Sequence, residues 1–170
     1  EPLDVLLQLR SHHGYLFCLQ PQRGSAFLGC SPEPLFRISP ECIETMAIAG
    51  TRPRGGSERE DEELAQELLA SSKDMLENAV TAEYIEQQLT ALADEVTVSD
   101  VFVMKLRHVQ HLARRIRARP KHGGRCASAT PIELLRTLNP TPAVCGESRP
   151  VATEFIRTQE VFDRGFYGGA

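Results

Sequence analysis

The 170-residue sequence predicts an α/β domain, because two different patterns of apolar residues follow one another along the chain. Residues 15–49 contain short apolar runs, rich in β-branched and aromatic side chains, that turn residues separate. From residue 58 onward, apolar side chains recur at helical spacing. The length allows one sizeable hydrophobic core, so we expect one domain or a large part of one.

The composition argues against several classes of protein. A net charge of −4 without a single-sign tail gives little reason to expect nucleic-acid or anionic-membrane partners, and no apolar run is long enough to span a bilayer. The cysteines are odd in number and form no C-x-x-C pair, which favours a reduced intracellular protein, in the cytoplasm or in a plastid of a plant or alga. They are Cys18, Cys30, Cys42, Cys126 and Cys145.

The first part of the chain predicts a short helix and then strands. Apolar residues at helical spacing indicate an amphipathic helix over residues 3–10. Four apolar runs follow, and their short connections favour an antiparallel meander over parallel crossovers. The runs are Tyr15–Leu19, Ala26–Cys30, Leu35–Ile38 and Cys42–Ala49.

Two helices are predicted after residue 58. Acidic residues from Glu58 onward suit the positive end of a helix dipole. Ser71 and Asp74 form a plausible capping box that starts the second helix. Its apolar line uses Leu76, Val80, Tyr84 and Leu92, and its polar line uses Asp74, Glu77 and Thr81.

The second half of the chain is less clear. The apolar spacing over residues 98–118 fits a helix, yet the β-branched content there also allows strands. Thr130-Pro131-Ile132-Glu133 predicts a helix start, with a threonine cap and a proline in the first turn. The remaining predicted segments are a loop over 119–129, a helix end at Asn139-Pro140, a rigid loop over 140–146 and a helix over Pro150–Thr158.

Glu33 is the first candidate for chemistry. It lies between two prolines that restrict the backbone at the end of a strand. A carboxyl that is fixed and partly desolvated there would have a raised pKa, as a general acid near neutral pH requires. The alternative is an ordinary polar turn, which the residues alone favour.

A glycine-containing loop, Ala49-Gly50-Thr51, offers backbone amides and a hydroxyl to a small polar ligand. Arg52 and Arg54 could balance the charge of an anionic ligand. The loop lacks the Gly-Lys-Ser/Thr ending of a phosphate loop. The alternative is a tight turn that needs glycine.

Asp74 and Glu77 are three residues apart on the predicted helix, a spacing that can hold one hard cation directly or through water. Magnesium usually takes only one or two protein carboxylates. The alternative is a surface ion pair between Lys73 and Glu77. His111 can orient a substrate or serve as a core histidine, and without further context the core is favoured.

Six motifs follow one another along the chain: Phe27–Glu33, Ile48–Gly55, Ser72–Asn78, His108–Leu112, Asn139–Gly146 and Phe162–Gly169. In this order they resemble the motifs of the chorismate-binding enzymes. This family comprises isochorismate synthases, salicylate synthases, and the large subunits of anthranilate and aminodeoxychorismate synthases. Each motif is moderately specific, whereas six in register over nearly the whole chain are highly specific.

The resemblance implies an α/β (α+β) fold of antiparallel sheets packed face to face, with flanking helices, in which residues 98–118 are extended. It also implies that residues 1–170 are the central part of a catalytic domain, incomplete at both ends and belonging to a longer, possibly multidomain chain. The family's catalytic lysine, substrate-binding arginine and second metal-binding glutamate have no counterpart here. We therefore expect the chain to be inactive alone.

The resemblance further implies roles for individual residues. Glu33 is similar to the general acid that protonates the hydroxyl leaving C4 of chorismate, and His111 would lie close to the ring. Glu77 would bind magnesium, with Asp74 acting through water, so that the metal neutralises the substrate's ring carboxylate. The expected substrate-binding residues are Ala49, Gly50, Thr51, Ala143 and Tyr167, the last holding a carboxylate.

The resemblance implies conversion of chorismate to isochorismate, a magnesium-dependent isomerisation by water addition. The motifs around His111 and Ala143 are most similar to isochorismate synthases of the menaquinone and phylloquinone pathways. Amine-using relatives tend to carry a hydroxyl residue at the position of Ala143. Because Arg52-Pro53-Arg54-Gly55 is equally at home in anthranilate synthases, amine transfer stays an alternative, as does a non-catalytic remnant of the fold.

Overall fold

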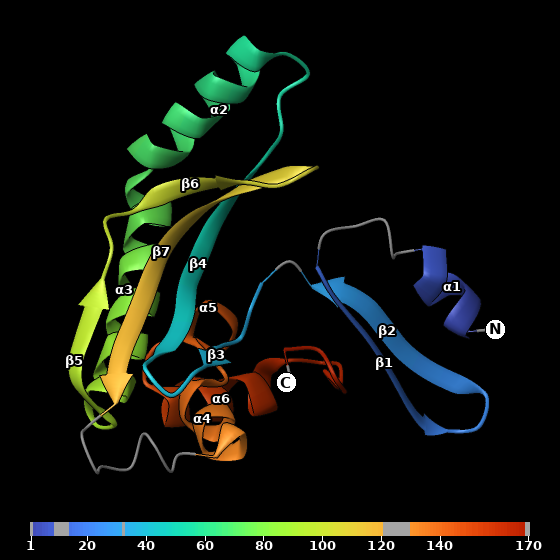
Figure 1. The fold of residues 1–170 in the computed structure, drawn as a ribbon. Helices are drawn as coiled ribbons and strands as arrows, with labels where there is room; N and C mark the ends of the chain where they lie inside the picture. Colours follow the sequence, from blue (N-terminus) through green and yellow to red (C-terminus); the bar gives the residue numbers. More distant parts are fainter. Residues whose placement is uncertain (1, 9–13, 32, 121–129, 169–170) are drawn as a thin grey trace. The chain divides into compact units, whose positions relative to one another are not determined.

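The computed structural model describes residues 2–8, 14–31, 33–120 and 130–168, and the chain forms two compact units, Glu1–Leu35 and Phe36–Ala170 (Figure 1). Both units contain helix and antiparallel strand, which confirms the predicted fold class. No helix within the described ranges is both long enough and apolar enough to cross a membrane.

The first unit is a helix and a β-hairpin. Helix α1 spans Pro2–Gln8, and strands β1 (Tyr15–Gln22) and β2 (Ser25–Ser31) pair antiparallel. Gly24 makes the turn with a φ of 89°, a conformation that glycine adopts without steric cost.

The second unit is built on a five-stranded antiparallel sheet. The strands run in the order β3-β4-β7-β5, and β6 also pairs with β7 (Figure 1). Alternate residues at the start of β4 are buried, as a strand with one face on the core requires. The strands are β3 (Arg37–Ile38), β4 (Ile43–Pro53), β5 (Ala93–Val98), β6 (Phe102–Lys105) and β7 (Val109–Pro120).

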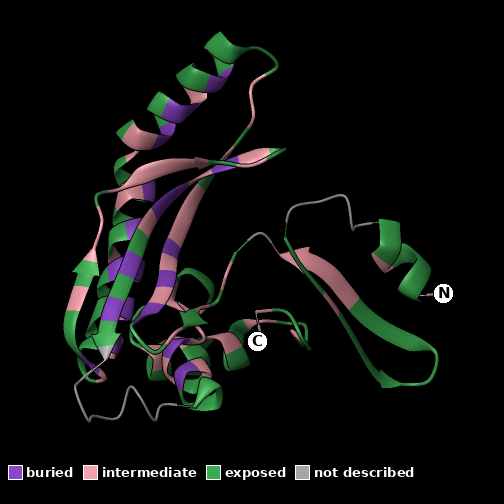
Figure 2. Ribbon diagram, viewed as in Figure 1, coloured by how far each residue is buried: buried purple, intermediate pink, exposed green. Residues whose placement is uncertain are grey.

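Helix α3 lies along this sheet, and the hydrophobic core fills the space between them (Figure 2). Ile85 and Leu89 of α3 meet Ile43 of β4 and Ile116 of β7 there, all of them buried. The helices of this unit are α2 (Glu58–Ala70), α3 (Ser72–Thr90), α4 (Pro131–Leu138), α5 (Pro142–Cys145) and α6 (Arg149–Gln159).

The predicted helix starts are confirmed by their caps. The Ser71 side chain accepts a hydrogen bond from the Asp74 N–H at the start of α3, and the Ser71 N–H donates to the Leu68 carbonyl at the end of α2. One residue therefore ends α2 and begins α3. Thr130 and Glu133 form the complete capping box of α4.

The predicted strand meander is only partly correct. The hairpin β1–β2 and the pair β3–β4 are antiparallel, but they lie in two separate sheets rather than one. The third predicted strand shrinks to Arg37–Ile38. Because the two sheets belong to different units, their face-to-face packing stays a prediction.

The helical interpretation of residues 98–118 is wrong, and the extended form implied by the family resemblance is confirmed. Leu112 and Ile116 are four residues apart, a spacing that fits one face of a helix and also alternate positions of a strand. Both are buried on β7. The predicted loop over 119–129 begins inside β7 and otherwise lies outside the described residues.

Two predicted loops are also partly regular structure. The glycine-containing loop predicted at Ala49-Gly50-Thr51 continues β4, which extends as far as Pro53, because a bulge at residues 49 and 50 lets the strand keep pairing with β7. The rigid loop over 140–146 contains the short helix α5. The last predicted helix is confirmed as α6, one residue longer at each end.

Candidate functional site

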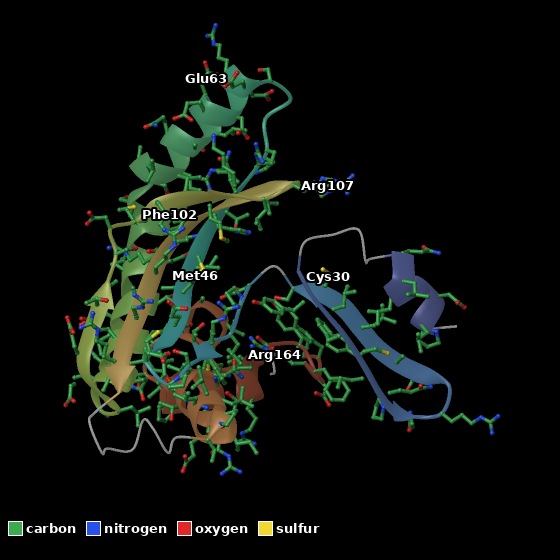
Figure 3. The ribbon with its side chains drawn as sticks, in the orientation of Figure 1. Cys30, Met46, Glu63, Phe102, Arg107 and Arg164 are labelled. Carbon is green, nitrogen blue, oxygen red and sulfur yellow. The ribbon has the colours of Figure 1, made fainter. Side chains whose placement is uncertain are left out.

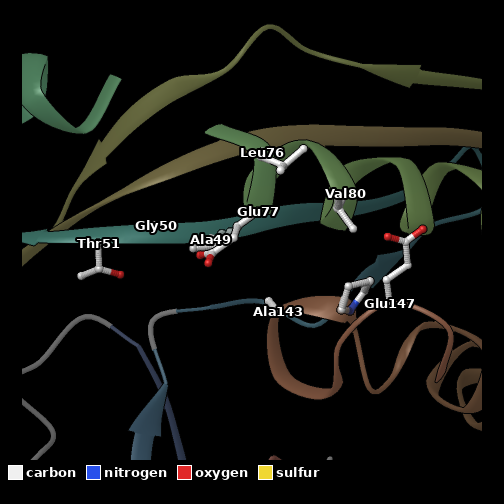
Figure 4. A pocket seen from close by; sticks show the side chains of 10 residues that line it. Ala49, Gly50, Thr51, Leu76, Glu77, Val80, Ala143 and Glu147 are labelled. Atoms are coloured by element: carbon white, nitrogen blue, oxygen red, sulfur yellow. The ribbon is translucent and has the colours of Figure 1, made fainter. Parts of the chain in front are cut away.

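A pocket of ≈ 510 Å³ lies within the second unit, between β4, α3 and the segment around α5 (Figure 4). It brings together five of the candidate site residues, which come from separate parts of the chain: residues 49–51, Glu77 and Ala143. The lining residues are Ile48, Ala49, Gly50, Thr51, Leu76, Glu77, Val80, Pro142, Ala143 and Glu147.

Gly50 shapes the wall that β4 contributes. Its φ is 86°, and a Cβ at this position would lie 3.0 Å from Cβ of Asp74 and 3.4 Å from Cδ1 of Leu112. The backbone of β4 therefore approaches the start of α3 so closely that a Cβ at residue 50 would be in tight contact with Asp74. This contact sets the spacing between the bulge and the helix that carries Glu77.

Thr51 and His111 face one another across β4 and β7. Oγ1 of Thr51 lies 2.9 Å from Nδ1 of His111. Partial burial lowers the pKa of His111, and a hydrogen bond with the Gly50 backbone partly opposes that shift. His111 is thus neither a fully buried core residue nor a lining residue of the pocket; it supports Thr51, which lines it.

Asp74 is turned toward β4 and paired. Its Oδ2 accepts a hydrogen bond from Nη2 of Arg52 at 3.0 Å, and its side chain is 12 % exposed. A hydrogen bond with Ser71 and the nearby Arg52 guanidinium lower the pKa of Asp74. Neither Arg52 nor Arg54, which pairs with Asp61, lines the pocket, so the expectation that they balance a ligand's charge there is not supported.

Glu77 presents a half-exposed carboxylate to the pocket, and Lys73 lies 3.4 Å from its Oε1. The predicted surface pair is therefore present on the same carboxylate that lines the cavity. Within the described ranges, no three or more His, Cys, Asp or Glu side chains cluster as a complete metal cage would require. One pocket carboxylate still fits magnesium, which takes most of its ligands from substrate and water.

Glu33 lies in the first unit, just after β2. Its backbone N–H donates to Oγ of Ser31 at 3.3 Å, which fixes the turn. Although part of the residue is exposed, burial of its carboxyl raises the pKa of Glu33, as expected for a general acid. Its approach to Glu77, in the other unit, stays a prediction.

Tyr167 does not line the pocket and is 69 % exposed. Its ring lies 5.8 Å from Cζ of Arg164, which is labelled in Figure 3 and pairs with Glu160. The role expected for Tyr167 in holding a carboxylate stays a prediction.

Two lining residues differ from the sequence interpretation. Leu76 belongs to the predicted apolar line of α3, yet it is 65 % exposed and forms part of the pocket wall. Glu147 was not predicted as a site residue, although it directly follows the last residue of the motif that carries Ala143. Four cysteines in the described part of the chain are free thiols, which agrees with the absence of a disulfide framework there: Cys18, Cys30, Cys42 and Cys145.

Comparison with known proteins shows what this chain is similar to. The model of the family described as "Chorismate binding enzyme" matches residues 1–170. A salicylate biosynthesis isochorismate synthase of Pseudomonas aeruginosa is 41 % identical over 98 % of this chain and 34 % of its own length. A chloroplastic isochorismate synthase of Catharanthus roseus is 39 % identical over 99 % of this chain and 29 % of its own length.

Among solved structures, the menaquinone-specific isochorismate synthase MenF of Escherichia coli superposes with a TM-score of 0.82 at 32 % sequence identity. The match covers 96 % of this chain and 37 % of MenF. The chain thus spans about a third of the length of these relatives. The family match over the whole sequence and the likeness of fold lead to one conclusion: this chain belongs to the chorismate-binding enzyme family.

Proposed function

We propose that residues 1–170 form the central part of the catalytic domain of an isochorismate synthase, within a longer chain. In the reaction, water adds at C2 of chorismate as the C4 hydroxyl leaves, which makes the enzyme an isomerase. The observation that carries the proposal is the pocket, where Gly50 and Thr51 face Glu77 and Ala143. A small cyclic acid fits a cavity with a polar backbone wall and an apolar wall from α3.

Glu33 would act as the general acid. It donates its proton to the hydroxyl that leaves C4, so that water rather than hydroxide departs. The raised pKa of its carboxyl supports this role, because the acid must still hold a proton near neutral pH. The base that activates the attacking water would come from outside this sequence, so the chain alone would not turn over chorismate.

Glu77 would hold magnesium, with Asp74 acting through water. The metal would neutralise the ring carboxylate of the substrate and fix its position in the pocket. Lys73 and Glu77 form a solvent-exposed ion pair, which contributes little stability. The Glu77 carboxylate is therefore available to bind a metal ion. Asp74 is less free, because Arg52 already occupies one of its oxygens.

Ala143 favours water as the nucleophile. Its methyl group lines the pocket and cannot form a hydrogen bond with incoming ammonia. The free thiols of the described residues support a reduced, intracellular location, either cytoplasmic or, as in the plant relative, plastidic.

The proposal is tested with the full-length protein, chorismate and magnesium, in the presence and absence of ammonium. Isochorismate is the expected product in both cases. Formation of anthranilate or aminodeoxychorismate with ammonium would instead assign the protein to the amine-transferring branch. No product and no chorismate binding would indicate a non-catalytic remnant of the fold.

The acid role of Glu33 has a matched control. Ser39-Pro40-Glu41 repeats the sequence of Ser31-Pro32-Glu33, and in both turns the Glu N–H donates to the preceding Ser Oγ. We expect Glu33→Gln to lower kcat by at least ~100-fold, the usual size of an acid–base contribution. Glu41→Gln should keep normal turnover and folding. Near-normal turnover of Glu33→Gln would remove the assigned role.

A further inference from the structure

We propose that Arg52 is a positioning residue for the pocket: through its ion pair with Asp74 it fixes the Gly50 bulge of β4 against the first turn of α3, and so sets where Glu77 stands relative to Thr51. The inference rests on the proposed function, since it gives Arg52 a part in binding the substrate of that pocket. Arg52 itself does not line the cavity.

The Arg52 guanidinium joins three elements through three hydrogen bonds. Nη2 donates to Oδ2 of Asp74 on α3 at 3.0 Å, and Nε donates to Oε1 of Glu67 on α2 at 3.1 Å. Nη1 donates to the carbonyl of Thr51, its neighbour on β4, at 2.9 Å. A planar group with donors in a fixed fork can hold a strand and two helices in one geometry, which a lysine cannot.

Of these hydrogen bonds, the one with Asp74 matters most for the pocket. Its two side chains are 24 % and 12 % exposed, whereas Glu67 is 62 % exposed, so solvent screens the Asp74 pair far less. A partly buried carboxylate that loses its hydrogen-bonded arginine is costly and moves toward water or another donor. Movement of Asp74 would carry the first turn of α3 with it.

The contact between Asp74 and Gly50 transmits that movement to the site. The glycine backbone approaches Asp74 so closely that even a methyl group at residue 50 would meet its Cβ at 3.0 Å. Gly50 and Thr51 line the pocket on one side of this contact, and Glu77 lines it one helical turn after Asp74. A shift at the Arg52–Asp74 pair therefore changes the separation of two pocket walls.

The chain offers a matched control in a second arginine–aspartate pair. Arg54, also after the bulge, bonds Asp61 of α2 through Nε at 2.6 Å and Nη2 at 2.9 Å, and the Asp61 side chain is 8 % exposed. This pair also ties the end of β4 to a helix. Neither of its residues lines the pocket or is among the nearest neighbours of a Cβ added at Gly50.

The experiment compares four variants of the full-length enzyme: Arg52→Gln, Asp74→Asn, the double variant Arg52→Gln/Asp74→Asn, and the control Arg54→Gln. We expect the KM for chorismate to rise about 10-fold in Arg52→Gln with a smaller change in kcat, because binding geometry rather than the proton donor is disturbed. The double variant should be no worse than the worse single variant, since both changes break one pair. Arg54→Gln should lower the melting temperature yet keep KM within about 2-fold of wild type.

Hydrogen exchange in the full-length protein supplies a readout that does not depend on turnover. Amides of residues 49–52 should exchange faster in Arg52→Gln than in wild type, and at the wild-type rate in Arg54→Gln. If Arg52→Gln does not fold, Arg52→Lys keeps the charge and one bond to Asp74, and should show an intermediate rise in KM.

Three results would overturn the proposal. The first is a wild-type KM in folded Arg52→Gln, and the second is an equal rise in Arg54→Gln. The third is additive loss in the double variant, which would mean that Arg52 acts independently of Asp74. A wild-type enzyme that leaves chorismate unchanged would refute the proposed function instead, while the exchange measurement would still decide whether Arg52 holds the bulge.

Discussion

Replacing Gly50 with alanine tests the close approach of β4 to α3. Two costs add at this position. The left-handed φ of 86° strains any residue with a Cβ, at about 1–2 kcal/mol. The new methyl group would also lie 3.0 Å from Cβ of Asp74 and 3.4 Å from Leu112, and overpacking of this kind costs about 1–3 kcal/mol. We expect a total loss of about 2–5 kcal/mol in the free energy of unfolding.

Urea denaturation followed by circular dichroism measures this loss, with the linear extrapolation giving the free energy of unfolding of each variant. Gly165→Ala is the matched control in the same unit, because Gly165 also has a positive φ, 54°, but an added Cβ would meet no atom within 4 Å. The difference between the two variants isolates the contact with α3. If Gly50→Ala lost no more stability than Gly165→Ala, the inference that β4 packs closely against Asp74 would be wrong.

Two further changes probe how the sheet is held to its helices. Asn78→Ala should lower the free energy of unfolding by about 1–3 kcal/mol. The buried Asn78 side chain donates to the carbonyls of Ala47 and Leu112 and accepts from Arg114, so all three groups would lose a partner. Urea denaturation measures the loss, and an unchanged midpoint would contradict it. Asp61→Asn should flatten the pH dependence of stability in acid. Arg54 and the Gly55 N–H hold the pKa of Asp61 below that of the unfolded chain, so its stabilisation is present above pH ~4 and is lost as the pH falls. Thermal melts between pH 2 and pH 7 measure this, with Glu63→Gln on the exposed pair with Arg59 as the control.

Local signals in the sequence were sufficient for the helix ends and for several site residues. Ser71 and Thr130 carry their caps within four residues, so the pattern contains all the interacting groups. Ala49, Gly50, Thr51, Glu77 and Ala143 were found because each lies inside a motif, and the pocket brings them together.

Features that depend on distant partners were not visible in the sequence. The continuation of β4 past Gly50 requires β7 to pair with it on both sides of the bulge, about 60 residues away along the chain. The exposure of Leu76 depends on the empty space in front of it, which no periodicity records. The pairing of Arg52 with Asp74 likewise depends on how α3 crosses the sheet, so Arg52 was interpreted as a ligand-binding residue.

The serine shared by α2 and α3 has a consequence for how this part of the chain can vary. The Ser71 N–H donates to the last turn of α2, and the Ser71 hydroxyl accepts from the first turn of α3. There is therefore no linker between the two helices that could accommodate an added or deleted residue. One residue inserted in the first turn of α3 would rotate α2 by about 100° about the helix axis relative to the rest of α3. Arg52 could not then reach both Glu67 and Asp74. Insertions and deletions that preserve the cavity must therefore fall outside this junction.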